Sequence, residues 1–181
     1  MKLRGNKVRV KARALILAGT VLSAACAGSK MSMIQPSSGP ARSVSRLAIA
    51  PGSGLLGDAI GLELFNRGLT IVDANEAGAI AARAGLKEFE ITSTQGMEAL
   101  RSRGIDAVLT AKSVAGADGT PESASVRVTD TSTAGVIAGI TWQNGWGGER
   151  GSIADRVMRK NLSDAASEIA NELLQRLRPT P

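Results

Sequence analysis

Between residues 104 and 142, short apolar runs alternate with turns rich in glycine and polar residues. The run 107–111 is almost wholly apolar, as expected for a strand that is covered on both faces. The run 126–129 alternates valine with polar residues, which predicts a strand with one face in solvent. A third strand, 136–142, follows a polar turn long enough for an antiparallel hairpin. The pattern predicts the sheet of a small α/β domain.

Two more apolar runs and three helical patterns precede these strands. The runs 46–50 and 69–72 predict strands. The helical patterns end at Gly68, Gly85 and Gly104, and glycine is the usual residue where the backbone turns left-handed after a helix. The elements therefore predict a mixed sheet flanked by helices.

The first of these helices is predicted over 54–67, with Ser53 as its N-cap. The next helix is predicted to begin at a capping box formed by Asp73 and Glu76. In the first helix the apolar residues are expected to pack on the sheet. These residues are Leu55, Leu56, Ala59, Ile60, Leu62 and Phe65.

The last element is predicted to be one long amphipathic helix from Ser152 to the turn before Pro179. Ser152 and Asp155 have the spacing of a capping box. The apolar positions recur at steps of three to five residues and predict a single stripe that lies on the sheet. These positions are Ile153, Val157, Leu162, Ala165, Ile169, Leu173 and Leu177.

The N-terminal residues have the layout of a secretory signal. Six basic residues precede the apolar run 14–22, and small residues follow up to Cys26. Cleavage before Cys26 removes six of the 22 basic residues and none of the 16 acidic ones, so the mature chain has no net charge. The formal charge of +6 on the full chain is therefore no indication of nucleic-acid binding, and we expect none.

Cys26 is the only cysteine, and it directly follows Leu22-Ser23-Ala24-Ala25. This resembles a bacterial lipobox, in which the cysteine carries a diacylglycerol, although Ser23 stands where leucine is usual. The alternative is a plain signal peptide with an incidental thiol. Ala27 rather than Asp after the cysteine favours the outer membrane, so we expect a lipid anchor on its periplasmic face.

The chain divides into three segments. Residues 1–25 are predicted to be the signal peptide, and 46–181 one α/β domain. Residues 26–45 are rich in Ser, Gly, Pro and Met without periodicity, which indicates a lipidated N-terminus and a flexible tether. Such a tether would hold the domain near a membrane without fixing its orientation.

One motif has the spacing of a dinucleotide-binding fingerprint. Gly52, Gly54 and Gly57 follow a strand and open a helix, and Asp73 ends the next strand about 20 residues on. The missing second mononucleotide half, the predicted export and Pro51 at the start of the turn favour a structural turn instead. We expect no cofactor, and keep a nucleotide-binding enzyme as an alternative.

The sequence contains no histidine and no other catalytic motif. We therefore expect no catalytic residue and no metal site. Glu88 and Glu90, on either side of Phe89, are interpreted as a solvated pair. Trp146 in the glycine-rich loop, with Arg150 nearby, is the candidate for partner binding, since Trp and Arg often anchor interfaces. The alternative places Trp146 over the edge of the sheet.

The order of elements resembles the CsgG-like envelope lipoproteins, a superfamily that includes the curli secretion lipoprotein, LpoB, PelC and the N-terminal domain of TolB. The segments that carry the resemblance are 46–51, 69–73, 103–109, 126–130 with Gly135, and the closing helix. The resemblance implies a non-catalytic lipoprotein that docks onto cell-envelope assembly or export machinery, often as a homo-oligomer. The alternative within this fold is an activator of a peptidoglycan synthase.

Overall fold

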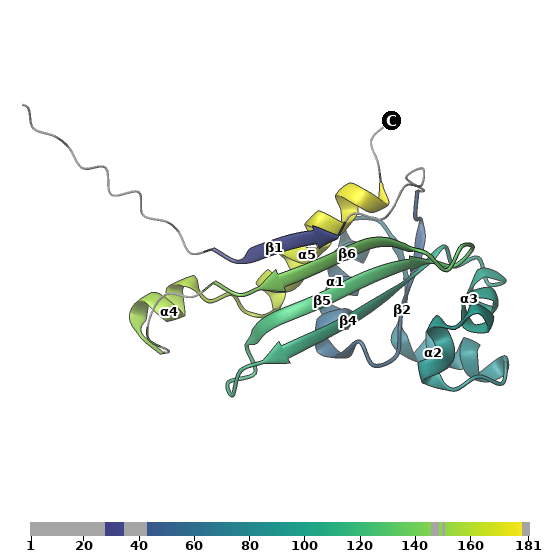
Figure 1. Ribbon diagram of the computed structural model, residues 1–181, viewed down its shortest axis with the longest axis horizontal. Helices are drawn as coiled ribbons and strands as arrows, with labels where there is room; N and C mark the ends of the chain where they lie inside the picture. The colour runs from purple at the N-terminus through teal and green to yellow at the C-terminus, as the bar shows by residue number, and fades with distance from the viewer. Residues whose placement is uncertain (1–27, 35–42, 146–148, 150, 179–181) are drawn as a thin grey trace, which may run out of the picture.

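The computed structural model describes residues 28–34, 43–145, 149 and 151–178, and Figure 1 shows its elements. In chain order these are β1 (Lys30–Ile34), β2 (Arg46–Ile49), α1 (Gly54–Asn66), β3 (Thr70–Val72), α2 (Ala74–Arg83), the 3-10 helix η1 (Glu88–Thr92), α3 (Thr94–Arg101), β4 (Ala107–Ala115), β5 (Pro121–Asp130), β6 (Val136–Gln143), α4 (Ile153–Met158) and α5 (Leu162–Leu177).

Within the described residues, six strands form one mixed sheet in the order β1-β6-β5-β4-β2-β3. β2 runs parallel to β3 and β4, whereas β4, β5, β6 and β1 pair antiparallel. This confirms the predicted fold class, with β5 and β6 as the hairpin expected from the polar turn. β4 and β5 are longer than their apolar runs, because the ladder continues through polar residues as far as Ala115 opposite Pro121, with a register shift after Val114.

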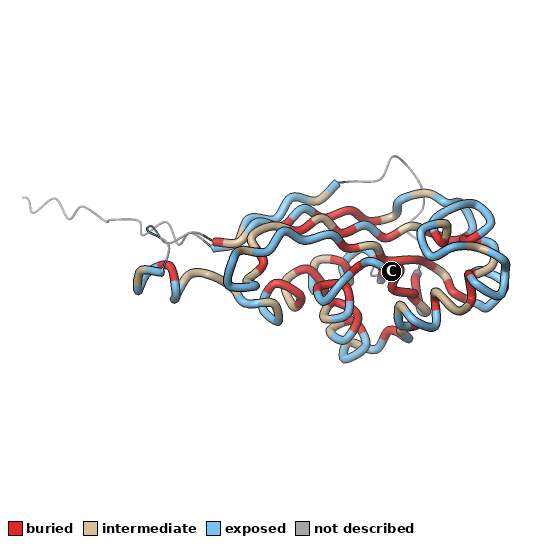
Figure 2. Tube along the Cα trace, turned by 90° about the horizontal axis from the view of Figure 1, so that it is seen from below, coloured by how far each residue is buried: buried red, intermediate tan, exposed pale blue. Residues whose placement is uncertain are grey.

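Two apolar clusters fill the space between the sheet and the helices. α1 and α5 cover one face across β2, β4, β5 and β6, and α2, η1 and α3 cover the other face near β2, β3 and β4. Figure 2 shows the buried residues concentrated where strands meet helices. The largest fully buried side chain of the larger cluster is that of Trp142.

Several local predictions are confirmed. Gly68 has φ of +89°, the left-handed conformation predicted after the first helix. The Asp73 carboxylate accepts a hydrogen bond of 2.8 Å from the Glu76 amide and so caps α2. Ser152 likewise accepts from the Asp155 amide at the start of α4. The side-chain caps at Asp73 and Ser152 are therefore confirmed, but neither closes a reciprocal capping box, and the Asp155 carboxylate accepts from the Gly151 amide instead.

Two predictions for α1 were wrong. Leu55, Leu62 and Phe65 point to solvent, because the helix buries only the narrow face formed by Leu56, Ile60, Leu64 and the glycines between them. Ser53 occupies the N-cap position, but its side chain makes no capping bond. Its hydroxyl instead accepts a hydrogen bond of 3.3 Å from the amide of Ala111 on β4.

The predicted closing helix is two helices. The backbone at Arg159 is extended, and Asn161 starts α5 with its own capping box to Asp164. As a result the predicted apolar stripe divides: Ile153 and Val157 on α4 are 77% and 79% exposed, whereas the α5 positions from Ala165 onward are buried.

The segment predicted as a tether contains a strand. β1 pairs antiparallel with β6 over five residues, from Lys30 opposite Gln143 to Ile34 opposite Gly139. Pairing satisfies the backbone hydrogen-bonding groups of β1 that face β6, and Met33 is partly buried against the main core. The sheet therefore extends 16 residues closer to Cys26 than the predicted domain boundary at residue 46.

Candidate functional site

Three predicted site residues lie outside the described residues. They are Cys26, predicted to be lipidated, and Trp146 and Arg150, predicted to bind a partner. These assignments stay predictions, and the candidate site is built from the surrounding residues that the structure places.

The glycine turn after β2 has the local geometry of a tight strand-to-helix connection. Gly52 and Gly54 have φ of +79° and +62°, so both need glycine. A Cβ on Gly57 would lie 2.4 Å from the Cβ of Ser53, so this glycine permits close packing within the turn. Ser53 in turn bonds to β4. The turn thus packs within itself and hydrogen-bonds to β4, as a structural turn does.

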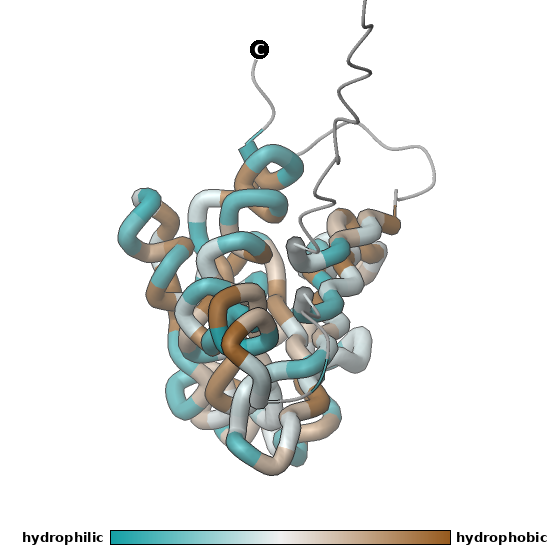
Figure 3. The backbone as a smooth tube through the Cα atoms, turned by 90° about the vertical axis from the view of Figure 1, so that its left-hand side faces the viewer, coloured by the Kyte–Doolittle hydropathy of each residue, from teal (hydrophilic) through white to brown (hydrophobic). Residues whose placement is uncertain are grey.

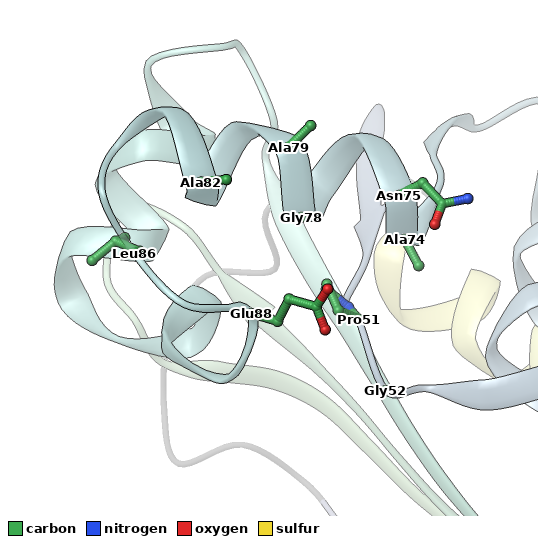
Figure 4. A pocket seen from close by; sticks show the side chains of 9 residues that line it. All are labelled: Pro51, Gly52, Ala74, Asn75, Gly78, Ala79, Ala82, Leu86 and Glu88. Carbon is green, nitrogen blue, oxygen red and sulfur yellow. The ribbon is translucent and has the colours of Figure 1, made fainter.

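A cavity of about 440 Å³ lies between this turn and α2 (Figure 4). Pro51 and Gly52 form one side, and small apolar residues of α2 form the other. The Glu88 side chain points toward Pro51. Asp73, the fourth residue of the fingerprint, caps α2 with its carboxylate. A proline and a glutamate beside the glycine turn, together with the engaged Asp73, favour the structural interpretation of this motif.

A convergence of polar groups from distant segments lies near the start of β1. The Glu168 carboxylate on α5 accepts hydrogen bonds from the Ser29 hydroxyl, the Trp142 indole and the Lys160 ammonium, and the indole Nε1 lies 2.9 Å from Oε2. We call Ser29, Trp142, Lys160 and Glu168 the N-terminal junction. It joins the residue before β1 to the buried centre of the domain.

Glu168 is partly buried, with 24% of its side chain exposed. Desolvation raises its pKa, but the hydrogen bonds from Lys160, Ser29 and Trp142 outweigh this, so the pKa of Glu168 is lowered. The carboxylate is therefore ionised at neutral pH and holds all three donors together.

Next to the junction, Asn144 holds the chain between α4 and α5 in place. The Asn144 side chain accepts a hydrogen bond from the Lys160 amide at 2.8 Å and donates to the Lys160 carbonyl oxygen at 2.8 Å. Its amide group also donates to the Pro121 carbonyl oxygen at 2.7 Å. The end of β6, the start of β5 and the chain between the two helices are thus joined beside the start of β1.

Sequence reasoning missed this junction because its members are distant along the chain. Ser29 and Glu168 are 139 residues apart, and each looks unremarkable in its own segment. The available signal was Trp142: a buried tryptophan usually needs a partner for its N–H, and a carboxylate on the helix that packs against its strand can supply one.

A second candidate surface is the outer side of α1. Leu55, Leu62 and Phe65 are 77%, 61% and 60% exposed. Leu62 and Phe65 line a groove of about 460 Å³ between α1 and β3, and Asp58 and Asp73 line it with them. We call this surface the α1 groove. It combines exposed apolar side chains with two carboxylates.

Among the described residues, no helix has both the length and the apolar character needed to cross a bilayer. The same residues contain no cluster of three or more histidine, cysteine or acidic side chains placed to hold a metal ion.

The class that these observations define is a mixed α/β sheet with helices on both faces and an N-terminal segment fixed to its edge.

No protein-family model matches the chain, and no curated protein matches it in sequence. Similar solved structures include the PelC dodecamer from Paraburkholderia phytofirmans, with 16% identity over 84% of this chain and 99% of that chain and a TM-score of 0.48. Lipoprotein GNA1162 from Neisseria meningitidis has 15% identity over 74% and 99%, with a TM-score of 0.45. These similarities concern the fold alone, and membership of the CsgG-like superfamily stays a prediction.

Proposed function

We propose that the mature chain is a non-catalytic lipoprotein of the bacterial cell envelope. An acylated Cys26 would hold it on the periplasmic face of the outer membrane, where it docks onto assembly or export machinery. The observation that carries the proposal is the position of the lipobox-like sequence, which ends three residues before Ser29 of the N-terminal junction. A lipid on Cys26 would therefore hold the folded domain directly.

Docking is proposed to use the α1 groove. Exposed aliphatic and aromatic side chains beside a groove are the kind of surface on which interface anchors bind. Asp58 and Asp73 favour a partner segment that places basic groups next to apolar ones. The partner class we propose is an envelope protein, and assembly of several copies of this chain is part of the same proposal.

The lipid anchor is tested by mass spectrometry of the mature protein purified from membranes. We expect a chain that begins at Cys26 and carries acyl groups, and a Cys26→Ala variant that leaves the membrane fraction. A mature chain without acyl groups would overturn this part of the proposal.

Docking is tested by co-purification from detergent-solubilised membranes. Leu62→Ser with Phe65→Ser should lose the retained envelope protein, whereas Phe89→Ser, which removes a still more exposed aromatic from η1, should keep it. Trp146→Ala tests the second predicted contact in the same assay. Retention of no envelope protein by any version, with a monomeric domain, would contradict docking. A peptidoglycan synthase as the retained protein would favour the activator alternative.

The enzyme alternative has a separate test. Calorimetric titration of the domain with NAD should give no saturable heat if the glycine turn is structural. Saturable heat at micromolar NAD that is lost in Gly54→Val would contradict the non-catalytic proposal.

A further inference from the structure

The helix α4 is held in one orientation by its buried face. Asp155 is 3% exposed, accepts a hydrogen bond of 2.9 Å from the Gly151 amide and pairs with Arg159 at 3.2 Å. Arg159 also reaches Asp118 in the turn between β4 and β5, at 3.5 Å. These contacts fix α4 against the hairpin and leave its other side free to face outward.

The outward side of α4 is apolar with one basic residue. Ile153 and Val157 lie one helical turn apart and are 77% and 79% exposed, and the exposed Arg156 lies to one side of them. Two aliphatic side chains beside a cation are the composition of a surface that lies at the boundary between lipid headgroups and acyl chains.

The lipid anchor would lie at the same end of the molecule. Ser29 is three positions after Cys26, which gives an extended reach of about 10 Å. Ser29 and Lys160 bond to the same carboxylate, and Lys160 follows the last residue of α4 by two positions. Figure 1 places α4 next to the start of β1, and Figure 3 views the molecule from this end.

We propose that α4 is a membrane-contacting element, with Ile153 and Val157 in the headgroup boundary of the bilayer that holds Cys26. This inference rests on the proposed acylation. A short connection cannot place acyl chains in a bilayer while the neighbouring end of the domain stays far from it. The acyl chains supply the affinity, and α4 sets the orientation of the sheet relative to the membrane.

The test places a fluorophore on α4 of the acylated protein. An acylated Cys26 holds its sulfur as a thioether, so a cysteine introduced by Val157→Cys is the one reactive thiol of the chain. The matched control is Phe89→Cys. Phe89 is 74% exposed and lies on η1, beside α2 and α3 at the other end of the molecule. Each labelled protein is reconstituted in phosphatidylethanolamine and phosphatidylglycerol vesicles that contain a lipid-borne quencher.

We expect the quencher to lower the fluorescence of the Val157 label about twofold or more and to leave the Phe89 label unchanged. Adding Ile153→Asp should reduce the quenching at Val157, whereas Leu62→Asp should not. An acylated protein whose Val157 label stays unquenched overturns this inference alone. Protection of that label already in detergent, without lipid quenching, assigns α4 to a contact between copies and also overturns it. A chain without acyl groups overturns the proposed anchor together with this inference.

Discussion

The helices α4 and α5 contain similarly spaced apolar residues, yet they lie in opposite environments. On α5, Ile169 and Leu173 are fully buried between α1 and the sheet. On α4, Ile153 and Val157 face away from the domain. The cause is the extended backbone between the helices, which redirects the chain. The comparison teaches that periodicity identifies residues that share a side of a helix, but not whether a sheet lies under that side.

The two helices should differ most in how much stability is lost when an apolar side chain is truncated to alanine. Leu173→Ala should lower the free energy of unfolding by about 2–5 kcal/mol, because it leaves a cavity in the core. Val157→Ala on α4 should change it by less than about 0.5 kcal/mol. Urea unfolding followed by circular dichroism measures both, and equal losses would show that α4 packs against the domain.

A smaller effect is expected at the N-terminal junction, which connects the two regions. Glu168→Gln should cost about 1–3 kcal/mol, because the Lys160 ammonium loses its ionic partner and the Ser29 and Trp142 donors face a neutral amide. Glu172→Gln, one turn further along α5, is the control. Hydrogen exchange should be faster in β1 of Glu168→Gln alone, and unchanged exchange would contradict the role of Glu168 in holding β1.

The break between the helices depends on Asn161. Its side chain accepts a hydrogen bond of 2.9 Å from the Asp164 amide, and the Asp164 carboxylate accepts from the Asn161 amide. Asn161→Ala should cost about 1 kcal/mol. Asn161→Asp keeps a capping acceptor and should cost less. Thermal unfolding of the two variants gives the difference, and an equal loss in both would contradict a capping role.

The smallest effect is expected from pH. The folded-state pKa of Glu168 is below its ordinary value of 4.5. Its contribution to stability is therefore complete above the pKa of the unfolded chain and is lost as pH falls through the lower folded-state pKa. Stability should decline below about pH 4.5, and Glu168→Gln should remove part of that slope. A slope that is identical in the variant would show that other carboxylates account for it.

The sequence predicted the features that depend on neighbouring residues. The strands β2 to β6, the hairpin, the left-handed glycine at Gly68 and the cap at Asp73 follow from local patterns, and the structure has all of them. Ser53 shows where such reasoning fails. Its position was right, but the Ala111 amide on β4 competes for its hydroxyl.

The features that sequence reasoning missed depend on contacts between distant segments. β1 is a five-residue edge strand whose residues are mostly exposed, so its short sequence gives only a weak signal and its pairing with β6 reveals it. The exposure of Leu62 and Phe65 depends on which face of α1 packs on the sheet and α5, and that is set by the fold. The meeting of Ser29 with Glu168 depends on the whole fold.

The placement of β1 has a mechanical consequence. Tension on the chain before Ser29 reaches the domain through the Ser29–Glu168 hydrogen bond and through the antiparallel ladder of β1 with β6. A pull along the strand axis loads the rungs of this ladder together in shear, whereas a sideways pull opens them one after another from Lys30. Drag that tilts the domain would thus separate β1 from β6 one hydrogen bond at a time, while a straight pull would load all the hydrogen bonds of this ladder at once.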